Sequence, residues 1–257
     1  MTVVKMEIAD RDIVRGLEKG LAVIEAFDES RPKLSLTDVA RITGLTRAAA
    51  RRSLLTLTKL GYARYDGKFF VLTPKILRLG YAYLSSTTLP LRIQPFLEEI
   101  SAAVGESSSA AILEEMEVVY VARAATRRIM SIGLSVGSRL PAYCTSLGRA
   151  LLAFQPAEAL DDYFRKVDLV PLTPRTKRSQ RDIRRALAEV QTLGYALVDQ
   201  ELELGLRSIA VPIFDNRGTA VAAINVSAQA ARITLEDMVR KFLPHLKRAQ
   251  EALRQII

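Results

Sequence analysis

Apolar positions recur with helical spacing over the first sixty residues of the chain. Leu17, Leu21 and Ile24 form one stripe, closed by Phe27, and a second stripe runs from Ala50 to Leu60. Spacings of three and four residues place side chains on one face of a helix. The pattern therefore predicts a helix around each stripe and a shorter one between them, in which Val39, Ala40 and Ile42 face inward.

Capping residues sharpen these boundaries. Ser35 is followed three residues later by Asp38, in the manner of a capping box. Gly44 supplies the left-handed residue that ends a helix, and Thr46 is placed to cap the next one. Helix, tight turn and second helix predict a helix-turn-helix unit, whose second helix meets base edges with its N-terminal part. Small residues at Ala48 and Ala49 are expected to let the backbone approach the DNA groove.

The pattern changes after Gly61 from helical to strand-like. Two β-prone runs, 62–65 and 68–72, flank Asp66-Gly67, which is a strong hairpin signal. A hairpin in this position is the wing of a winged helix-turn-helix, and Arg64 and Lys68 flank its tip.

Thr73-Pro74 then opens a helix that is apolar nearly all round, which needs a partner surface and is expected to pack on a second subunit. We therefore expect a DNA-binding domain at 1–73, a linker helix at 74–88 and a second domain at 89–257.

The second domain alternates strand-like and helical runs and is expected to be α+β with an antiparallel sheet. The expected strands are 109–113, 118–123, 129–134, 196–199, 208–214 and 220–226. The expected helices are one around 95–104, then 146–154, 156–164, 179–193 and a long final helix from Thr234.

Charge is concentrated in the first domain. Between Arg31 and Arg78 there are eleven Lys and Arg residues against only Asp38 and Asp66, which accounts for the net charge of +9 of the whole chain. A local excess of this size predicts a surface that binds phosphates.

Composition limits which functional classes of protein are expected. One Cys and one His leave no nucleophile and base pair, and no glycine-rich nucleotide motif is present, so an enzyme and a nucleotide cofactor are not expected. Cys144 is expected to be a small buried hydrophobe. The N-terminus shows no secretory signal and no apolar run is long enough to span a bilayer, so we expect a cytoplasmic protein without membrane contact.

Two charged clusters of the second domain have alternative interpretations. Asp199, Glu201 and Glu203 alternate, so on a strand they would share one face and bind a metal, or hold Arg123, Arg128 or Arg207 in ion pairs. The ion pairs are favoured, and no metal is expected. Arg123, Arg127 and Arg128 are either a clamp for a carboxylate ligand or a solvated basic cluster.

Motifs along nearly the whole chain resemble the IclR-type transcriptional regulators. The N-terminal ones lie at 16–21, 46–52 and 60–62, and the C-terminal ones at 119–123, 137–141, 148–153, 205–210 and 222–227. Segments 48–52, 72–81 and 141–146 are most similar to the branch of PcaR, PcaU and PobR, which controls aromatic-acid catabolism through the β-ketoadipate pathway.

The resemblance implies a winged helix-turn-helix followed by a GAF-like effector domain that binds a small organic acid. It also implies a homodimer or homotetramer on double-stranded operator DNA. The PcaR and PcaU type generally activates its targets, so contact with RNA polymerase is a further expectation. Protocatechuate, 4-hydroxybenzoate and β-ketoadipate all remain open as effectors.

Two sets of site residues follow. In the recognition helix Arg47 and Arg51 share one face, suited to guanine, while Arg52 points to phosphate, although the roles of the three are interchangeable at this stage. The expected DNA contacts are Ser35, Thr37, Thr46, Arg47, Ala48, Arg51, Arg52, Arg64 and Lys68.

For the effector, residues 145–148 open a helix whose amides and hydroxyls could converge on an anion. The resemblance adds the loop before that helix and several strand positions, although Tyr143 and Leu206 are as readily core residues. The expected effector contacts are Ala142, Tyr143, Thr145, Ser146, Leu147, Asp199, Leu206, Ser208, Asn225 and Ser227.

Three alternatives remain open. The chain could be a repressor of the same type acting on another pathway, such as glyoxylate or sugar-acid use. It could be an architectural DNA-binding protein without an effector. It could also be an enzyme that uses the second domain on an organic acid.

Overall fold

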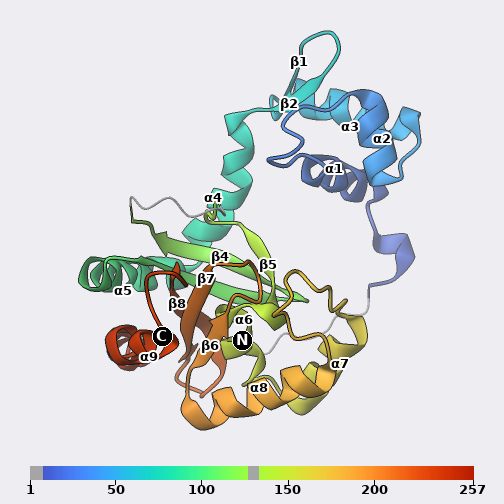
Figure 1. Cartoon of the computed structure of the whole chain (residues 1–257). Coiled ribbons are helices and arrows are strands. Elements are labelled where there is room, and N and C mark those ends of the chain that lie inside the picture. The colour runs from blue at the N-terminus through green and yellow to red at the C-terminus, as the bar shows by residue number, and fades with distance from the viewer. Residues whose placement is uncertain (1–7, 127–132) are drawn as a thin grey trace. The chain divides into compact units, whose positions relative to one another are not determined.

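The computed structural model describes residues 8–126 and 133–257 of the chain (Figure 1). Two compact units, Met1–Tyr83 and Leu84–Ile257, divide the chain within the expected linker at 74–88.

The first unit has the elements of a winged helix-turn-helix. A short 3-10 helix precedes three helices, a two-stranded hairpin follows them, and a further helical segment leads to the division. In order these are η1 (Asp10–Asp12), α1 (Arg15–Glu25), α2 (Leu36–Thr43), α3 (Arg47–Lys59), β1 (Ala63–Tyr65), β2 (Phe70–Leu72), η2 (Pro74–Ile76) and α4 (Leu77–Ser86).

The predicted caps are present in the helix-turn-helix. Ser35 Oγ accepts a hydrogen bond from the Asp38 amide at 3.2 Å, and Asp38 Oδ2 accepts one from the Ser35 amide at 3.0 Å, which completes the capping box. Gly44 ends α2 with a φ of 67°, and Thr46 Oγ1 accepts from the Ala49 amide at 3.2 Å to begin α3. Local sequence thus sets both ends of the turn between the two helices.

Three features of this unit differ from expectation. Leu17 and Leu21 are 63% and 45% exposed, because α1 turns Val23 to the core instead, with Ile24 and Phe27 partly buried beside it. Leu60 is 52% exposed because it lies one residue beyond the end of α3. Ala49 is buried in the core, so of the two small residues only Ala48 is available for close approach to DNA.

The second unit is a six-stranded antiparallel sheet with helices on both faces (Figure 1). The strand order is β5-β4-β3-β8-β7-β6, with every neighbouring pair antiparallel. The strands are β3 (Ser107–Glu114), β4 (Glu117–Ala124), β5 (Arg139–Pro141), β6 (Ala196–Asp199), β7 (Leu206–Phe214) and β8 (Ala220–Gln229). The helices are α5 (Thr88–Val104), η3 (Ala142–Cys144), α6 (Ser146–Leu152), α7 (Ala157–Lys166), α8 (Gln180–Leu193), α9 (Leu235–Asp237), the π-helical η4 (Met238–Phe242) and α10 (Leu243–Arg254).

Each face of the sheet has its own apolar core. Ala111, Ala210 and Ala223 pack with η3, α6 and α8 on what we name the α6 face. Ile209 and Ile224, which alternate with those alanines along the strands, pack with α5 and α10 on the α10 face. Small side chains under α6 let that short helix lie close to the sheet.

The expected strand 129–134 falls largely outside the described residues. Its residues 129–132 are not described, and residues 133 and 134 are not in a strand. The edge strand is instead β5, which pairs with β4 from Glu117 opposite Pro141 to Val119 opposite Arg139. Three residues at an edge are too few to show an alternating pattern. Within the described residues, no helix has both the length and the hydropathy needed to cross a bilayer.

Candidate DNA-binding surface and effector site

The basic side chains of α3 lie on its exposed face. Arg47, Arg51 and Arg52 are exposed, whereas Ala50 and Leu54 are fully buried against the rest of the unit. Positions 47 and 51 are one helical turn apart and therefore share a face, and position 52 lies about 100° further round. Thr37, Ala48, Arg64 and Lys68 are also exposed.

Ser35 and Thr46 have a different role from the exposed cations. The Ser35 hydroxyl donates to Asp38 Oδ2 at 2.6 Å as well as capping α2, and the Thr46 hydroxyl caps α3. Both oxygens are occupied within the unit. These two side chains therefore fix the angle at which α3 is presented.

In the second unit, part of the helix start that was expected to bind an anion is engaged by its own loop. Thr145 Oγ1 accepts from the Gly148 amide at 3.1 Å and donates to the Pro141 carbonyl at 3.2 Å. Tyr143 is 1% exposed and its hydroxyl donates to the Val170 carbonyl at 2.6 Å. Ala142 and Leu147 are fully buried. Thr145 and the Gly148 amide are thus engaged within the segment, whereas Ser146 Oγ is not, and the expected anion site at 145–148 stays a prediction.

A row of polar side chains crosses the α6 face of the sheet. Arg123 on β4 pairs with Ser109 on β3, and Ser109 pairs with Asn225 on β8. Directly paired residues of antiparallel strands point to the same face, and Asn225 is itself paired with Ala210 of the α6-face core. Two residues further along the strands, on the same face, Ser107, Ser227 and Ser208 form a second row.

The two rows run from the surface into the interior. Arg123, Ser227 and Leu206 are half-buried, whereas Asn225 is 4% exposed and Ser109 2%. Arg123 Nη1 donates to Ser109 Oγ at 3.0 Å, and Asn225 Nδ2 donates to Ser227 Oγ at 3.1 Å. The sequence placed Asn225, Ser208 and Ser227 on this face, but it did not single out Ser107 or Ser109. The signal that would have found them is the run of serines at 107–109 in an otherwise apolar strand.

Buried hydrogen-bonding capacity remains unused around these rows. Asn225 Oδ1 and Ser146 Oγ have no hydrogen-bond partner among the described residues, and both belong to elements packed on the α6 face. An unsatisfied buried polar atom costs about 1–3 kcal/mol, so each such atom calls for an explanation. A bound ligand with a hydroxyl group would explain these atoms, because its hydroxyl could donate a hydrogen bond to one of them.

Arg123 is the cation of these polar rows. Among the described residues, no carboxylate lies within ion-pair distance of its guanidinium. Burial lowers the pKa of Arg123 from its ordinary value, an effect only partly offset by Tyr120. A half-buried guanidinium with no acid partner among the described residues is a ready partner for an acid from outside.

The three carboxylates after β6 do not share a strand face, which corrects that expectation. β6 ends at Asp199, and Glu201 and Glu203 lie in the turn that follows. Asp199 is paired with Arg207, and the Arg207 guanidinium bonds Asp199 Oδ1 at 2.6 Å on the α10 face. Asp199 is therefore on the opposite side of the sheet from Ser208 and Asn225. Arg207 is an ion-pair partner as expected, and Arg128 lies outside the described residues.

Glu201 forms a buried ion pair that the sequence did not predict. Arg149 Nη1 and Nη2 donate to the two carboxylate oxygens of Glu201 at 2.7 and 2.5 Å, and Arg149 Nε donates to the Tyr143 carbonyl at 2.9 Å. Lys177 Nζ adds a third cationic donor at 2.8 Å. This network ties η3 and α6 to the turn after β6.

Cys144 and the carboxylates lack the chemistry of a catalytic or metal site. Burial raises the pKa of the Cys144 thiol to about 12, which keeps it protonated at neutral pH. His245 lies on α10, across the sheet from Cys144, so the thiol has no nearby imidazole base. In the described part of the chain, no three His, Cys, Asp or Glu side chains are arranged to hold a metal ion.

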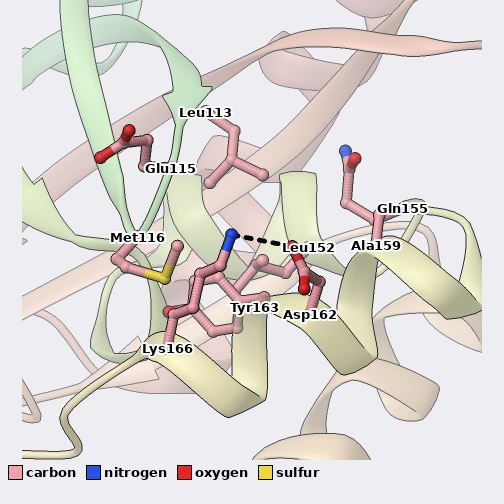
Figure 2. Close-up of a pocket in the computed structure, with 9 residues that line it drawn as sticks. All are labelled: Leu113, Glu115, Met116, Leu152, Gln155, Ala159, Asp162, Tyr163 and Lys166. Atoms are coloured by element: carbon pink, nitrogen blue, oxygen red, sulfur yellow. Dashed lines mark hydrogen bonds and ion pairs between the residues drawn. The ribbon is translucent and has the colours of Figure 1, made fainter. Parts of the chain in front are cut away.

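A surface pocket of about 480 Å³ opens between the β3–β4 turn and helices α6 and α7 (Figure 2). Leu113, Met116 and Tyr163 contribute its apolar walls. Its cation, Lys166, is already paired with Asp162 at 2.9 Å (Figure 2). Because the charge of Lys166 is neutralised, this pocket is a weaker candidate for binding a carboxylate ligand than the polar rows on the sheet, which include Arg123.

Comparison with known proteins agrees with this architecture. Residues 16–67 match the IclR helix-turn-helix domain, and residues 81–255 match the family described as bacterial transcriptional regulator IclR C-terminal. The chain is 46% identical over 245 residues to the Pca regulon regulatory protein of Pseudomonas putida, covering 95% of this chain and 84% of the relative. It is 38% identical over 256 residues to the p-hydroxybenzoate hydroxylase transcriptional activator of Acinetobacter baylyi, covering 98% and 94%.

Two solved structures extend the likeness. A protein of Rhodococcus sp. RHA1, described as a transcriptional regulator, superposes with a TM-score of 0.84 at 48% identity, covering 95% of this chain and 98% of that one. The inducer-binding domain of the PobR transcription factor from Acinetobacter, a double mutant in complex with 3-hydroxybenzoic acid, gives a TM-score of 0.62 at 32% identity. That comparison covers 65% of this chain and 98% of the other.

A winged helix-turn-helix followed by a separate domain with a buried polar site defines a DNA-binding transcriptional regulator. The chain belongs to the IclR family of such regulators, as the two family matches and the relatives establish. These relatives are regulators of transcription, and the enzyme hypothesis is set aside for that reason.

Proposed function

We propose that this regulator responds to an aromatic hydroxy acid bound on the α6 face of the sheet and controls genes of aromatic catabolism. The observation that carries the proposal is the half-buried Arg123 guanidinium, which has no acid partner among the described residues and faces the same side as the unsatisfied Asn225 Oδ1. The relatives named for the Pca regulon and for p-hydroxybenzoate hydroxylase support the same class of ligand.

The chemistry of the two ends of the site favours a particular pairing. Arg123 with Ser109 offers donors to a carboxylate. Asn225 Oδ1 is an acceptor and needs a donor, such as a ring hydroxyl. An acid with a hydroxyl group on its ring, such as 4-hydroxybenzoate or protocatechuate, satisfies both. β-Ketoadipate would present a second carboxylate, which can only accept, so we place it after the hydroxy acids.

The remaining expected effector residues take supporting roles in this proposal. Ser227 and Leu206 line the half-buried end of the site, and Ser208 lies buried beside Ser227. Ser146 supplies the second unsatisfied oxygen. Ala142, Tyr143, Thr145 and Leu147 hold the segment that packs over the sheet. Asp199 is left out, because it lies on the α10 face.

For DNA, we propose that Arg47 and Arg51 read bases while Arg52, Arg64 and Lys68 hold phosphates, with Thr37 and Ala48 at the surface of contact. Two heads from a homodimer, or four from a homotetramer, would read a pseudo-palindromic operator in the cytoplasm. Leu77 and Tyr81 of α4 are 71% and 69% exposed in the single chain, which supports the expected packing on a second subunit. Contact with RNA polymerase follows if the protein activates transcription.

The first experiment is a thermal-shift panel on the purified protein with 4-hydroxybenzoate, protocatechuate, 3-hydroxybenzoate, benzoate and β-ketoadipate. A ligand that binds only the folded state raises the midpoint of thermal unfolding. At a ligand concentration a hundred times its dissociation constant, the added stability is about 2.7 kcal/mol. We expect a shift with a hydroxybenzoate and a smaller one with benzoate, which lacks the hydroxyl. A panel with no shift, or a shift with β-ketoadipate alone, would contradict the proposal.

A further inference from the structure

Two lysine side chains from different segments of the first unit lie over the same aromatic ring. Lys33 Nζ is 5.3 Å from the centroid of the Phe69 ring, and Lys68 Nζ is 5.1 Å from it. Lys33 belongs to the loop before α2, whereas Lys68 and Phe69 belong to the wing between β1 and β2. Both lysines are exposed and Phe69 is half-buried, so the two ammonium groups are presented to solvent on a shared support.

The backbone holds both segments in place. Leu34 and Phe70 form an antiparallel bridge, with the Leu34 amide donating to the Phe70 carbonyl at 3.1 Å and the Phe70 amide donating back at 2.8 Å. Both side chains are in the core of the unit, 4% and 5% exposed. This bridge attaches the loop before α2 to strand β2 of the wing. Lys33 and Lys68 both reach the Phe69 ring because the residues next to them are fixed.

The charge of the lysine pair is not neutralised by the residues described around it. Among the described residues, neither ammonium group is within ion-pair distance of a carboxylate. The nearby acid is Asp66, whose Oδ1 accepts hydrogen bonds from the amides of Lys68 at 2.9 Å and Phe69 at 2.7 Å. Those backbone bonds lower the pKa of Asp66 first, and Lys33 contributes less. Asp66 is thus engaged in shaping the turn while the two cations repel each other.

We propose that Lys33 and Lys68 together bind one phosphate of the DNA backbone, with the Phe69 ring holding their side chains at the surface. This site goes beyond the recognition helix and the wing, because Lys33 lies in neither, and it rests on DNA binding by this head. A phosphate between the two ammonium groups would relieve their repulsion and gain two charge-assisted hydrogen bonds. Contacts to phosphate position the protein on DNA without reading its sequence.

The test measures salt dependence of binding to two short duplexes, one of random sequence and one selected from a random pool by the wild-type protein. The slope of the logarithm of the binding constant against the logarithm of salt concentration falls by roughly 0.9 for each phosphate no longer neutralised. We expect the double variant Lys33→Gln/Lys68→Gln to lose about 0.9 per head, with each single variant between it and wild type. Preference for the selected duplex over the random one should be unchanged.

Controls separate this site from general loss of charge or of folding. Lys59→Gln removes one cation from the far end of α3, and its slope should stay close to that of wild type. Lys33→Arg/Lys68→Arg keeps both charges and should keep the wild-type slope. A double Gln variant that matches Lys59→Gln, or one that loses about twice 0.9, would overturn the shared phosphate. Loss of preference for the selected duplex, or loss of slope in the Arg variant, would overturn it as well.

Discussion

Arg149 and Glu201 are fifty-two positions apart in sequence and form a two-pronged ion pair in the interior of the second unit, with side chains only 2% and 4% exposed. The same guanidinium donates to the Tyr143 carbonyl, and the same carboxylate accepts from the Lys177 amide at 3.0 Å. The pair therefore joins the segment over the α6 face to the turn at the end of β6. Both segments border the proposed effector site.

Removing one member of this pair should be severe. Arg149→Met leaves the Glu201 carboxylate buried with only Lys177 as a cationic partner, and loss of one member of a buried pair costs about 3–5 kcal/mol. Urea unfolding of the effector domain in the full chain measures the change. The double variant Arg149→Met/Glu201→Gln should be more stable than Arg149→Met alone, because no unpaired charge remains. Additive losses in the two single variants would show that the pair is not coupled.

Stability should fall in acid because of Glu201. Burial by itself would raise the pKa of Glu201, but the hydrogen bonds and charges of Arg149 and Lys177 outweigh it and hold the pKa below the ordinary value of 4.5. A lowered folded-state pKa contributes stability that is complete above pH 4.5 and is lost as the pH falls through the folded-state value. In a series of urea unfolding curves at decreasing pH, Glu201→Gln should lose less stability than wild type below pH 4.5. Equal acid dependence in the two proteins would assign the loss to other groups.

Gly148 should not tolerate a side chain. A Cβ there would collide with the backbone of Ala142, which cannot move aside as a flexible side chain would. Gly148→Ala should cost at least about 1–3 kcal/mol, the usual range for overpacking. The matched control is Gly20→Ala in the middle of α1, where a Cβ meets nothing within 4 Å and helix propensity favours Ala by about 1 kcal/mol. Thermal unfolding should show opposite signs for the two variants, and a neutral Gly148→Ala would be inconsistent with the packing of η3 against α6.

Arg51 should carry sequence preference. Arg51→Ala should weaken binding to a selected operator by about 1–3 kcal/mol and relax the preference at one base position, if its guanidinium reads a guanine. Arg52→Ala should weaken binding to all sequences by a similar factor. Selection from a random pool with each variant distinguishes the two roles. An unchanged sequence preference with Arg51→Ala would show that Arg51 does not read a base and would leave that role to Arg47.

Local signals allowed the first unit to be predicted closely, because caps, turns and a hairpin depend on neighbouring residues. The structure confirms the predicted caps at Ser35, Gly44 and Thr46 and the predicted hairpin around Asp66-Gly67. The errors there concern burial: Leu17 and Leu21 carry a regular apolar stripe, but periodicity does not say which of two apolar faces meets the core.

The effector domain shows what local patterns leave out. Its antiparallel sheet and most of its strands were predicted, whereas β5 and the partners of the buried charges were not. Asp199 pairs with Arg207, and Ser208 pairs with Val198 one position further along the same two strands, so the side chains of Asp199 and Ser208 lie on opposite faces. Register decides this, and register depends on contacts between segments that are distant in the chain.

We expect an acid to bind on the α6 face through Arg123. Isothermal titration of the acid selected by the thermal-shift panel into wild type, Arg123→Met and Arg217→Met tests it most directly; Arg217 is an exposed arginine in the β7–β8 turn. We predict that Arg123→Met loses a charge-assisted contact, about 1.5–3 kcal/mol or at least tenfold in affinity. Arg217→Met should bind as wild type does. Equal affinity in all three proteins would contradict binding through Arg123 and place the effector elsewhere.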